Sequence, residues 1–220
     1  MTTQNEQHRA SKKDIEFIKK YFYDNYKDAK TELNWTNDYE LLISIILSAQ
    51  CTDKRVNIIT PALFKAYPNT YELSVAEYSD VVELVKTCSF FANKAKHIIA
   101  MAVKVQNEFG GVIPQTSKEL ISLAGVGTKT ANVFLIEGRG ANLMAVDTHV
   151  FRVSHRLGLS YEKTVEKTAV ELERTLMDNN MNIYHQAMVL FGRYKCKALS
   201  PICGDCELAI VCKSRGRFKV

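Results

Sequence analysis

Proline, tryptophan and long apolar runs are scarce in this chain. Four prolines and ten glycines among 220 residues leave little material for extended linkers, and there is one tryptophan. The longest apolar run, residues 41–49, is interrupted by Ser44 and Ser48. A membrane-spanning helix needs about 20 apolar residues, so we expect no membrane partner. No segment shows the persistent alternation of a half-buried strand, and the class expected is therefore all-α.

A secretory signal is also missing from the sequence as given. The first 14 residues are polar and contain no apolar stretch of the kind that a signal peptide requires. We therefore expect a cytoplasmic protein. Thiols stay reduced in that compartment, which favours metal binding over disulfide bonds for the six cysteines.

Four of these cysteines lie within 17 residues near the C-terminus, in the pattern C-x6-C-x2-C-x5-C: Cys196, Cys203, Cys206 and Cys212. Four thiols this close in sequence indicate one metal site, which can hold either zinc or an iron–sulfur cluster. Zinc ribbons usually pair two C-x2-4-C knuckles, and only one is present, so the spacing favours the cluster. Cys51 and Cys88 are interpreted as small buried hydrophobic residues.

The positive charge of the chain is concentrated beside these cysteines. The formal net charge is +5, and residues 193–220 contain seven basic and two acidic side chains, which equals the excess of the whole chain. A basic segment of this kind indicates a polyanionic partner such as nucleic acid, although it is also typical of a solvated tail.

Apolar spacings of three and four, with caps and glycine stops, predict helices through most of the chain. Pro61 conflicts with one helix over 54–66, so either a helix starts there with Thr60 as cap or the segment is kinked. The other expected helices cover residues 38–50, which should be mostly buried, 91–109 with Gly110-Gly111 as stop, 116–123, 128–137 with Gly138 as stop, 148–157 with Asp147 as cap, 163–177 and 181–195. The apolar residues of 91–109 that recur at spacings of three and four are Ile98, Ile99, Ala102, Val105 and Phe109.

A glycine-containing turn separates two of these helices. Gly125 and Gly127 can adopt positive φ and make a tight turn, and the apolar Leu123 and Val126 are expected to anchor it. The second helix then begins, near Thr128, with free N–H groups and the positive end of its dipole, which together suit a DNA phosphate. An ordinary helix–loop–helix connection has the same pattern.

Two residues add possible chemistry to this turn. Lys129 lies in the first turn of the second helix, where the positive dipole end favours the uncharged, nucleophilic amine. Asp147 follows eighteen residues later, at the expected start of another helix. Either residue alone is usually structural or solvated, but their combination with four clustered cysteines favours catalysis.

Taken together, these motifs resemble the endonuclease III family of DNA glycosylases, in the helix–hairpin–helix superfamily. The resemblance rests on L-x-G-V-G-x-K-T-A-N at 123–132, V-D-T-H at 146–149, L-S-A-Q-x-T-D at 47–53 and the cysteine spacing. It implies a 4Fe–4S cluster and two helical domains with the active-site cleft between them. A six-helix barrel domain with the hairpin would cover 31–141, and a cluster domain would combine 1–30 with 142–220.

The resemblance also implies a reaction and a partner. Lys129 would attack the sugar C1′ of a flipped nucleotide, Asp147 would assist, and β-elimination would cut the strand. The substrate would be double-stranded DNA with oxidised pyrimidines or abasic sites, bound by a monomer at the bacterial nucleoid. Residues expected to touch DNA are Gln50, Phe90, Gly125, Val126, Gly127, Thr128, Thr148, His149 and Arg193.

The match to the family pattern has local departures. Ser89 replaces a usual glycine, Phe90 stands where leucine is common as the inserted wedge, and Ala124 replaces the proline of the hairpin. Two other functions stay open. A monofunctional adenine-mismatch glycosylase would share the cluster but usually lacks a lysine at Lys129, and a non-catalytic DNA-binding module would need neither Lys129 nor Asp147.

Overall fold

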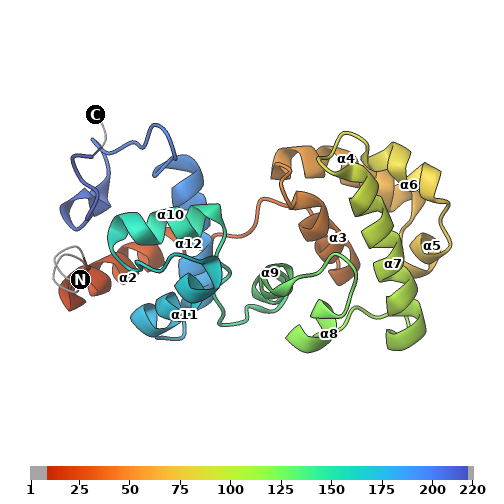
Figure 1. The fold of residues 1–220 in the computed structure, drawn as a ribbon, viewed down its shortest axis with the longest axis horizontal. Coiled ribbons are helices and arrows are strands. Elements are labelled where there is room, and N and C mark those ends of the chain that lie inside the picture. Colours follow the sequence, from red (N-terminus) through yellow and green to blue (C-terminus); the bar gives the residue numbers. More distant parts are fainter. Residues whose placement is uncertain (1–8, 218–220) are drawn as a thin grey trace. The chain divides into compact units, whose positions relative to one another are not determined.

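The computed structural model describes residues 9–217, and within them every regular element is a helix (Figure 1). The expected all-α class is confirmed. The helices are α2 (Lys12–Tyr26), α3 (Asp38–Ser48), α4 (Asp53–Ala66), α5 (Thr70–Ser74), α6 (Tyr78–Val85), α7 (Phe91–Phe109), α8 (Ser117–Ile121), α9 (Thr128–Arg139), α10 (Thr148–Leu157), α11 (Val165–Leu176), α12 (Met181–Tyr194) and the 3-10 helix η1 (Glu207–Ile210).

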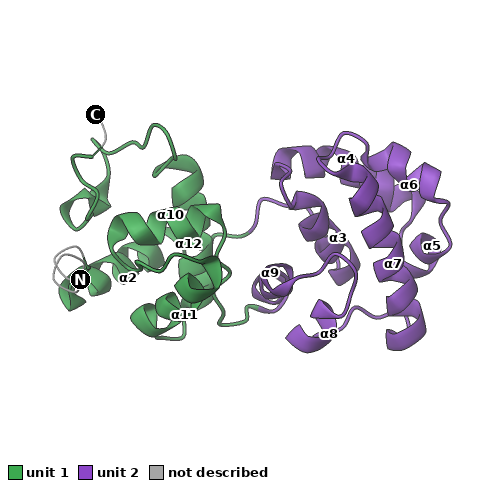
Figure 2. Cartoon of the chain, viewed as in Figure 1, with its two compact units in different colours: residues 1–30, 140–220 green, residues 31–139 purple. Residues whose placement is uncertain are grey.

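The helices form two compact units, shown in Figure 2. Unit 1 combines residues 1–30 with 140–220, and unit 2 is the continuous segment 31–139. The chain therefore leaves unit 1 after α2 and returns to it before α10. The sequence placed this return two residues later, between 141 and 142. The turn with Lys129 belongs to unit 2, whereas Asp147 and the four clustered cysteines belong to unit 1.

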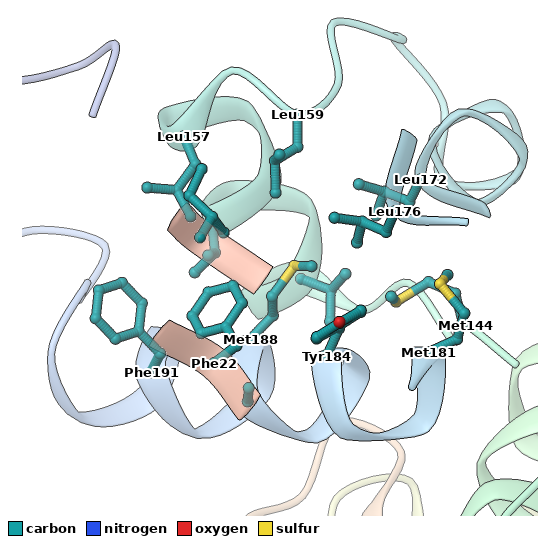
Figure 3. Packing of buried hydrophobic residues seen from close by; sticks show 14 of the residues in the cluster. Phe22, Met144, Leu157, Leu159, Leu172, Leu176, Met181, Tyr184, Met188 and Phe191 are labelled. Carbon is teal, nitrogen blue, oxygen red and sulfur yellow. The ribbon is translucent and has the colours of Figure 1, made fainter. Parts of the chain in front are cut away.

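Unit 1 is built around a core of α2, α10, α11 and α12 (Figure 3). Helix α2 begins with a capping box, in which Ser11 and Asp14 bond each other's backbone N–H groups. It buries Phe22, whose ring meets that of Phe191 of α12 edge-on at 5.8 Å between centroids. Leu208 of η1 also belongs to this core, so the cysteine-containing segment is packed against the helices.

Unit 2 has α3 as its central helix. Seven consecutive residues, 41–47, are buried, as the apolar run predicted, and α3 packs against α4, α7 and α9. Helix α7 covers the residues expected for it, and Gly110 ends it at φ 60°. Its buried face differs in part: Ala95, Ile98, Met101, Ala102 and Val105 are buried, whereas the expected Ile99 and Phe109 are half-exposed.

Of the two alternatives at Pro61, a helix start capped by Thr60 is wrong, because α4 runs through Pro61 from its cap at Thr52. Pro61 is exposed, and burial of Val56, Ile59 and Leu63 holds the helix on the other face. The helix expected over 38–50 ends two residues earlier, at Ser48.

Gly138 is also not a helix stop, since α9 continues to Arg139. A Cβ atom at Gly138 would lie 3.1 Å from Leu41 Cδ2 of α3, so the glycine allows close helix packing instead. The positive-φ residue that follows the helix is Gly140.

No helix among residues 9–217 combines the length and the apolar character needed to cross a bilayer.

The core of unit 1 gives a first test. Phe22→Ala removes a fully buried ring and should lower stability by about 3–5 kcal/mol. Phe17→Ala, on the same helix, removes a ring that is 39% exposed and should cost much less. Far-UV circular dichroism during thermal unfolding measures both shifts. Equal shifts would contradict the assignment of Phe22 to the core.

Candidate active site and cysteine cluster

The turn between α8 and α9 is anchored as the sequence predicted. Leu123 and Val126 are buried, and the N–H of Val126 donates to the Leu123 carbonyl at 3.2 Å. Gly125 has φ 78°, and a Cβ atom there would lie 2.9 Å from His97 Cβ, so both conformation and space require glycine. Of the two glycines that can adopt positive φ in this turn, Gly125 does so and Gly127 does not.

Gly127 serves the start of α9. Its carbonyl accepts the N–H of Ala131 at 3.0 Å, which is the first bond of the helix. A Cβ atom at Gly127 would meet nothing within 4 Å, so a side chain at this position would lie in open space. Thr128 and Lys129 follow and are exposed. The first N–H groups of a helix have no partner within it, and those of α9 follow directly after Gly127.

Asp147 caps α10. Its Oδ1 accepts the N–H of His149 at 2.8 Å and that of Val150 at 2.7 Å, so the carboxylate is fixed by two backbone donors. Asp147 is half-buried, and the preceding Val146 is buried in the core. Thr148, the first residue of α10, is exposed. The carboxylate therefore has one anchored oxygen at a helix start.

His149 is half-buried between α10 and α12, since a Cβ atom at Gly192 of α12 would lie 2.9 Å from His149 Cβ. Burial lowers its pKa, and the nearby Arg152 and Arg193 lower it further against the opposing effect of Asp147. Arg152 Nη2 lies 3.2 Å from His149 Nδ1 and donates to the Gly192 carbonyl at 2.7 Å. Because guanidinium only donates, Nδ1 accepts and the ring proton is on Nε2. His149 thus packs α10 against α12.

The four clustered cysteines line one pocket. Its empty volume, including its open mouth, is about 430 Å³, and Leu157, Phe191 and Leu208 form part of its wall. All four thiols are free and half-buried. Burial raises the pKa of Cys206 and Cys212, against backbone hydrogen bonds at Leu208 and Ser214 that lower it.

The four thiols line this pocket together. Thiolates are ligands of both structural zinc sites and iron–sulfur clusters, so the residues present fit either group. In the part of the chain that the structure describes, no three cysteine, histidine, aspartate or glutamate side chains gather closely enough for one metal ion.

Arginines of α10 hold the segment that begins at the first of these cysteines. Arg152 Nε donates to the Cys196 carbonyl at 3.0 Å. Arg156 donates to the carbonyls of Lys197 and Ala198 at 2.7 and 2.9 Å, and its Nη1 lies 3.3 Å from Cys196 Sγ. The sequence did not single out either arginine, although both follow Asp147 on one predicted helix.

Gln50 and Phe90 share an unusual backbone. Both are exposed, and they are the two non-glycine residues with positive φ among residues 9–217, at 54° and 57°. Gln50 follows α3, and Phe90 directly precedes α7. Both segments contact the buried side chain of Lys94. Lys94 was not among the predicted site residues, although its position four residues before Ile98 places it on the buried face of α7.

The basic C-terminal segment is partly engaged within the protein. Lys213 pairs with Asp14 at 2.8 Å, and Lys195 donates to the Asp205 carbonyl. Arg193 is half-buried near His149, whereas Arg215 and Arg217 are exposed. The charge available to a partner is thus smaller than the composition indicated.

The helical fold and the turn between α8 and α9 match a known superfamily. Residues 43–178 match the HhH-GPD superfamily of base excision DNA repair proteins. Endonuclease III of Bacillus subtilis (strain 168) is 38% identical over 91% of this chain and 92% of its own length. Endonuclease III of Synechocystis sp. (strain ATCC 27184 / PCC 6803 / Kazusa) is 41% identical over 86% and 87%. The chain belongs to the endonuclease III family.

A solved structure supports the same assignment. It is described as a trapped covalent intermediate of endonuclease III and DNA, in an estranged-adenine complex. It is 35% identical to this chain, with a TM-score of 0.89 over 94% of this chain and 98% of its own. The resemblance found in the sequence is therefore confirmed, and with it the family fold.

The turn provides a stability test. Gly125→Ala forces a Cβ atom against His97 at positive φ and should cost about 1–3 kcal/mol. Gly127→Ser adds a side chain in open space and keeps a good helix cap, so stability should change little. Differential scanning calorimetry compares the two. If Gly127→Ser were the more destabilising change, this account of the turn would be wrong.

Proposed function

We propose that this chain excises damaged bases from duplex DNA and then cuts the strand at the resulting abasic site. Membership of the endonuclease III family supports a bifunctional DNA glycosylase and AP lyase of base excision repair. The observation that carries the proposal is the exposed amine of Lys129 in the first turn of α9. It sits beside backbone N–H groups suited to a phosphate, where a nucleophile meets the DNA backbone.

The chemistry assigned to Lys129 requires a primary amine. A base within a duplex is shielded, so the nucleotide is first flipped out of the stack. The Lys129 nitrogen then forms a bond to C1′ as the bond from C1′ to the base breaks and the base leaves with its electron pair. Loss of a proton from the nitrogen and opening of the sugar give an imine.

The imine makes strand cleavage possible. It withdraws electrons from C2′, so a proton there becomes acidic. Loss of that proton forms a double bond between C2′ and C3′ and expels the 3′ phosphate, which cuts the strand. Water then releases Lys129 from the imine. A side chain without an amine can neither form this intermediate nor cut the strand by this route.

Asp147 is the proposed electrostatic partner of Lys129. Oδ1 is held by two backbone N–H groups, so the carboxylate needs no reordering at the moment of reaction. Its negative charge would stabilise the cationic sugar that develops as the base leaves, and it could accept the lysine proton. We propose that both residues act on the same nucleotide.

The DNA-contacting residues divide into three groups by place. Gly125, Val126, Gly127 and Thr128 are proposed to bind a phosphate through the turn and the start of α9. Gln50 and Phe90, exposed on strained backbone, are proposed to fill the gap left by the flipped nucleotide and to stack as a wedge. The third group, on unit 1, comprises Thr148, His149 and Arg193.

His149 has a role different from direct contact in this proposal. Its contact with Arg152 and its half-buried position favour a role in orienting the start of α10, next to Asp147. Thr148 and Arg193 remain the proposed contacts to the DNA backbone on this unit, with Arg215 and Arg217 as exposed additional charges.

The cysteine pocket is proposed to hold a 4Fe–4S cluster, which the family is known to carry. Its ligands would be Cys196, Cys203, Cys206 and Cys212, whose thiols line the pocket. The protein supplies apolar walls and the Arg156 contact to Cys196 Sγ. The cluster would fix the C-terminal segment and its basic residues, since binding of a metal group and local folding are coupled.

Other properties of the proposal follow from the family. The substrates would be oxidised pyrimidines and abasic sites in double-stranded DNA, bound by a monomer in the bacterial cytoplasm at the nucleoid. Unit 2 would be the six-helix barrel domain and unit 1 the cluster domain.

Covalent trapping tests the role of Lys129. Borohydride should trap the wild-type protein on duplex DNA containing thymine glycol, because it reduces the imine to a stable amine. Lys129→Ala should give no trapped complex and no strand cleavage. Denaturing gel electrophoresis measures both.

Lys118→Ala, an exposed lysine of α8, is the matched control and should trap normally. Adenine release from a mismatch without trapping would instead favour the monofunctional mismatch glycosylase. Tight DNA binding with neither base release nor cleavage would favour the non-catalytic module.

The Asp147→Asn variant tests whether Asp147 acts in catalysis or only in folding. Asparagine is an equally good helix cap, so melting temperature and lesion binding should stay close to wild type. Base excision should fall by about 10²-fold or more, since the negative charge is lost. Single-turnover kinetics measure the rate. Near-normal excision by a folded Asp147→Asn protein would remove Asp147 from the mechanism.

A further inference from the structure

The backbone at Gln50 and Phe90 is held in a conformation that neither residue favours. Residues with a Cβ atom rarely adopt positive φ. In the described part of the chain, Gln50 and Phe90 are the two non-glycine residues that do so. Such a conformation persists only where the surroundings impose it, and it is found at functional sites. Both segments share one contact, the side chain of Lys94.

Lys94 makes that contact from the first turn of α7. Its side chain is only 5% exposed, and its Nζ donates to the carbonyls of Leu47 at 2.7 Å and Ala49 at 2.6 Å. These carbonyls end α3 directly before Gln50. The buried ammonium thus caps the carbonyl end of α3, where the helix dipole favours a positive charge.

The same side chain reaches the Phe90 segment through Cys88, since Nζ donates to Cys88 Sγ at 3.2 Å. The backbone N–H of Lys94 donates to the Phe90 carbonyl at 3.1 Å, which is the ordinary first main-chain bond of α7 and does not depend on the side chain. The Cys88 thiol lies 3.2 Å from the Leu47 carbonyl. Burial raises the pKa of Cys88, so its thiol keeps the proton that it donates. Lys94 and Cys88 together join the end of α3 to the start of α7.

We propose that Lys94 is a positioning residue that fixes Gln50 and Phe90 relative to each other for insertion into DNA. This inference rests on the proposed function, since it assumes that these two exposed side chains enter the duplex. A flipped nucleotide leaves a gap of fixed size, so two groups entering it must keep a set separation. Lys94 sets that separation through hydrogen bonds to both segments and does not touch the reacting atoms.

An apolar side chain cannot replace the ammonium in this role. Lys94→Met keeps much of the volume but removes the donors, which leaves the Leu47 and Ala49 carbonyls without this partner. The end of α3 and the Phe90 segment would then be free to move apart. Insertion should suffer, while Lys129, which lies on a different helix, keeps its surroundings.

The experiment compares two substrates under single-turnover conditions. One is duplex DNA with thymine glycol, which requires flipping and insertion, and the other is a single strand with an abasic site, which requires neither. Lys94→Met should slow base excision from the duplex about 10- to 100-fold and change single-strand cleavage less than about twofold. Lys104→Met removes an ammonium of the same helix that pairs with Glu108 at the surface, and should match wild type on both.

The outcomes test the positioning role of Lys94 and the proposed function separately. Equal losses on both substrates, or none on either, would overturn the positioning role of Lys94. If Lys94→Met does not fold, Lys94→Gln, which keeps two donors on a shorter side chain, is held to the same ratio of duplex to single-strand rates. Absence of base excision by the wild-type protein would instead overturn the proposed function, whatever the variants do.

Discussion

The pair of hydrogen bonds that Asp147 accepts at the start of α10 is the interaction on which unit 1 depends most. It fixes the carboxylate and begins the helix in one step. From there α10 packs on α12, and its arginines Arg152 and Arg156 hold the backbone after Cys196. A single helix therefore carries the proposed catalytic carboxylate at one end and supports the cysteine segment further along.

This arrangement favours a structural role for the four clustered cysteines. They lie far from Lys129 in sequence and in the other compact unit, and nothing in the proposed reaction requires electron transfer. Their pocket is built from the same core that positions α10, with Leu157 and Phe191 in its wall. A group bound in this pocket would stabilise α10, which begins at Asp147, and also the C-terminal segment that contains the exposed Arg215.

Features set by local sequence were predictable. The cap at Asp147, the stop at Gly110 and the anchoring of the turn by Leu123 and Val126 depend on neighbouring residues alone. Features set by tertiary contact were not. Pro61 is tolerated because α4 is buried on its other face, and Gly138 serves packing against Leu41 rather than a helix end.

The candidate site divides in the same way. Its motifs identified Lys129 and Asp147, whereas the strained backbone at Gln50 and Phe90 has no local signal, because glycine or asparagine would normally mark it. The local sequence does not distinguish Lys94, which contacts both segments, from the other lysines of the chain. Only its place on the apolar face of α7 could have distinguished it.

The identity of the nucleophile is the central claim, and peptide mapping of the borohydride-reduced wild-type adduct tests it most directly. After digestion of protein and DNA, mass spectrometry should find the sugar remnant on the peptide that contains Lys129. An adduct on any other amine, with the Lys129 peptide unmodified, would contradict the account.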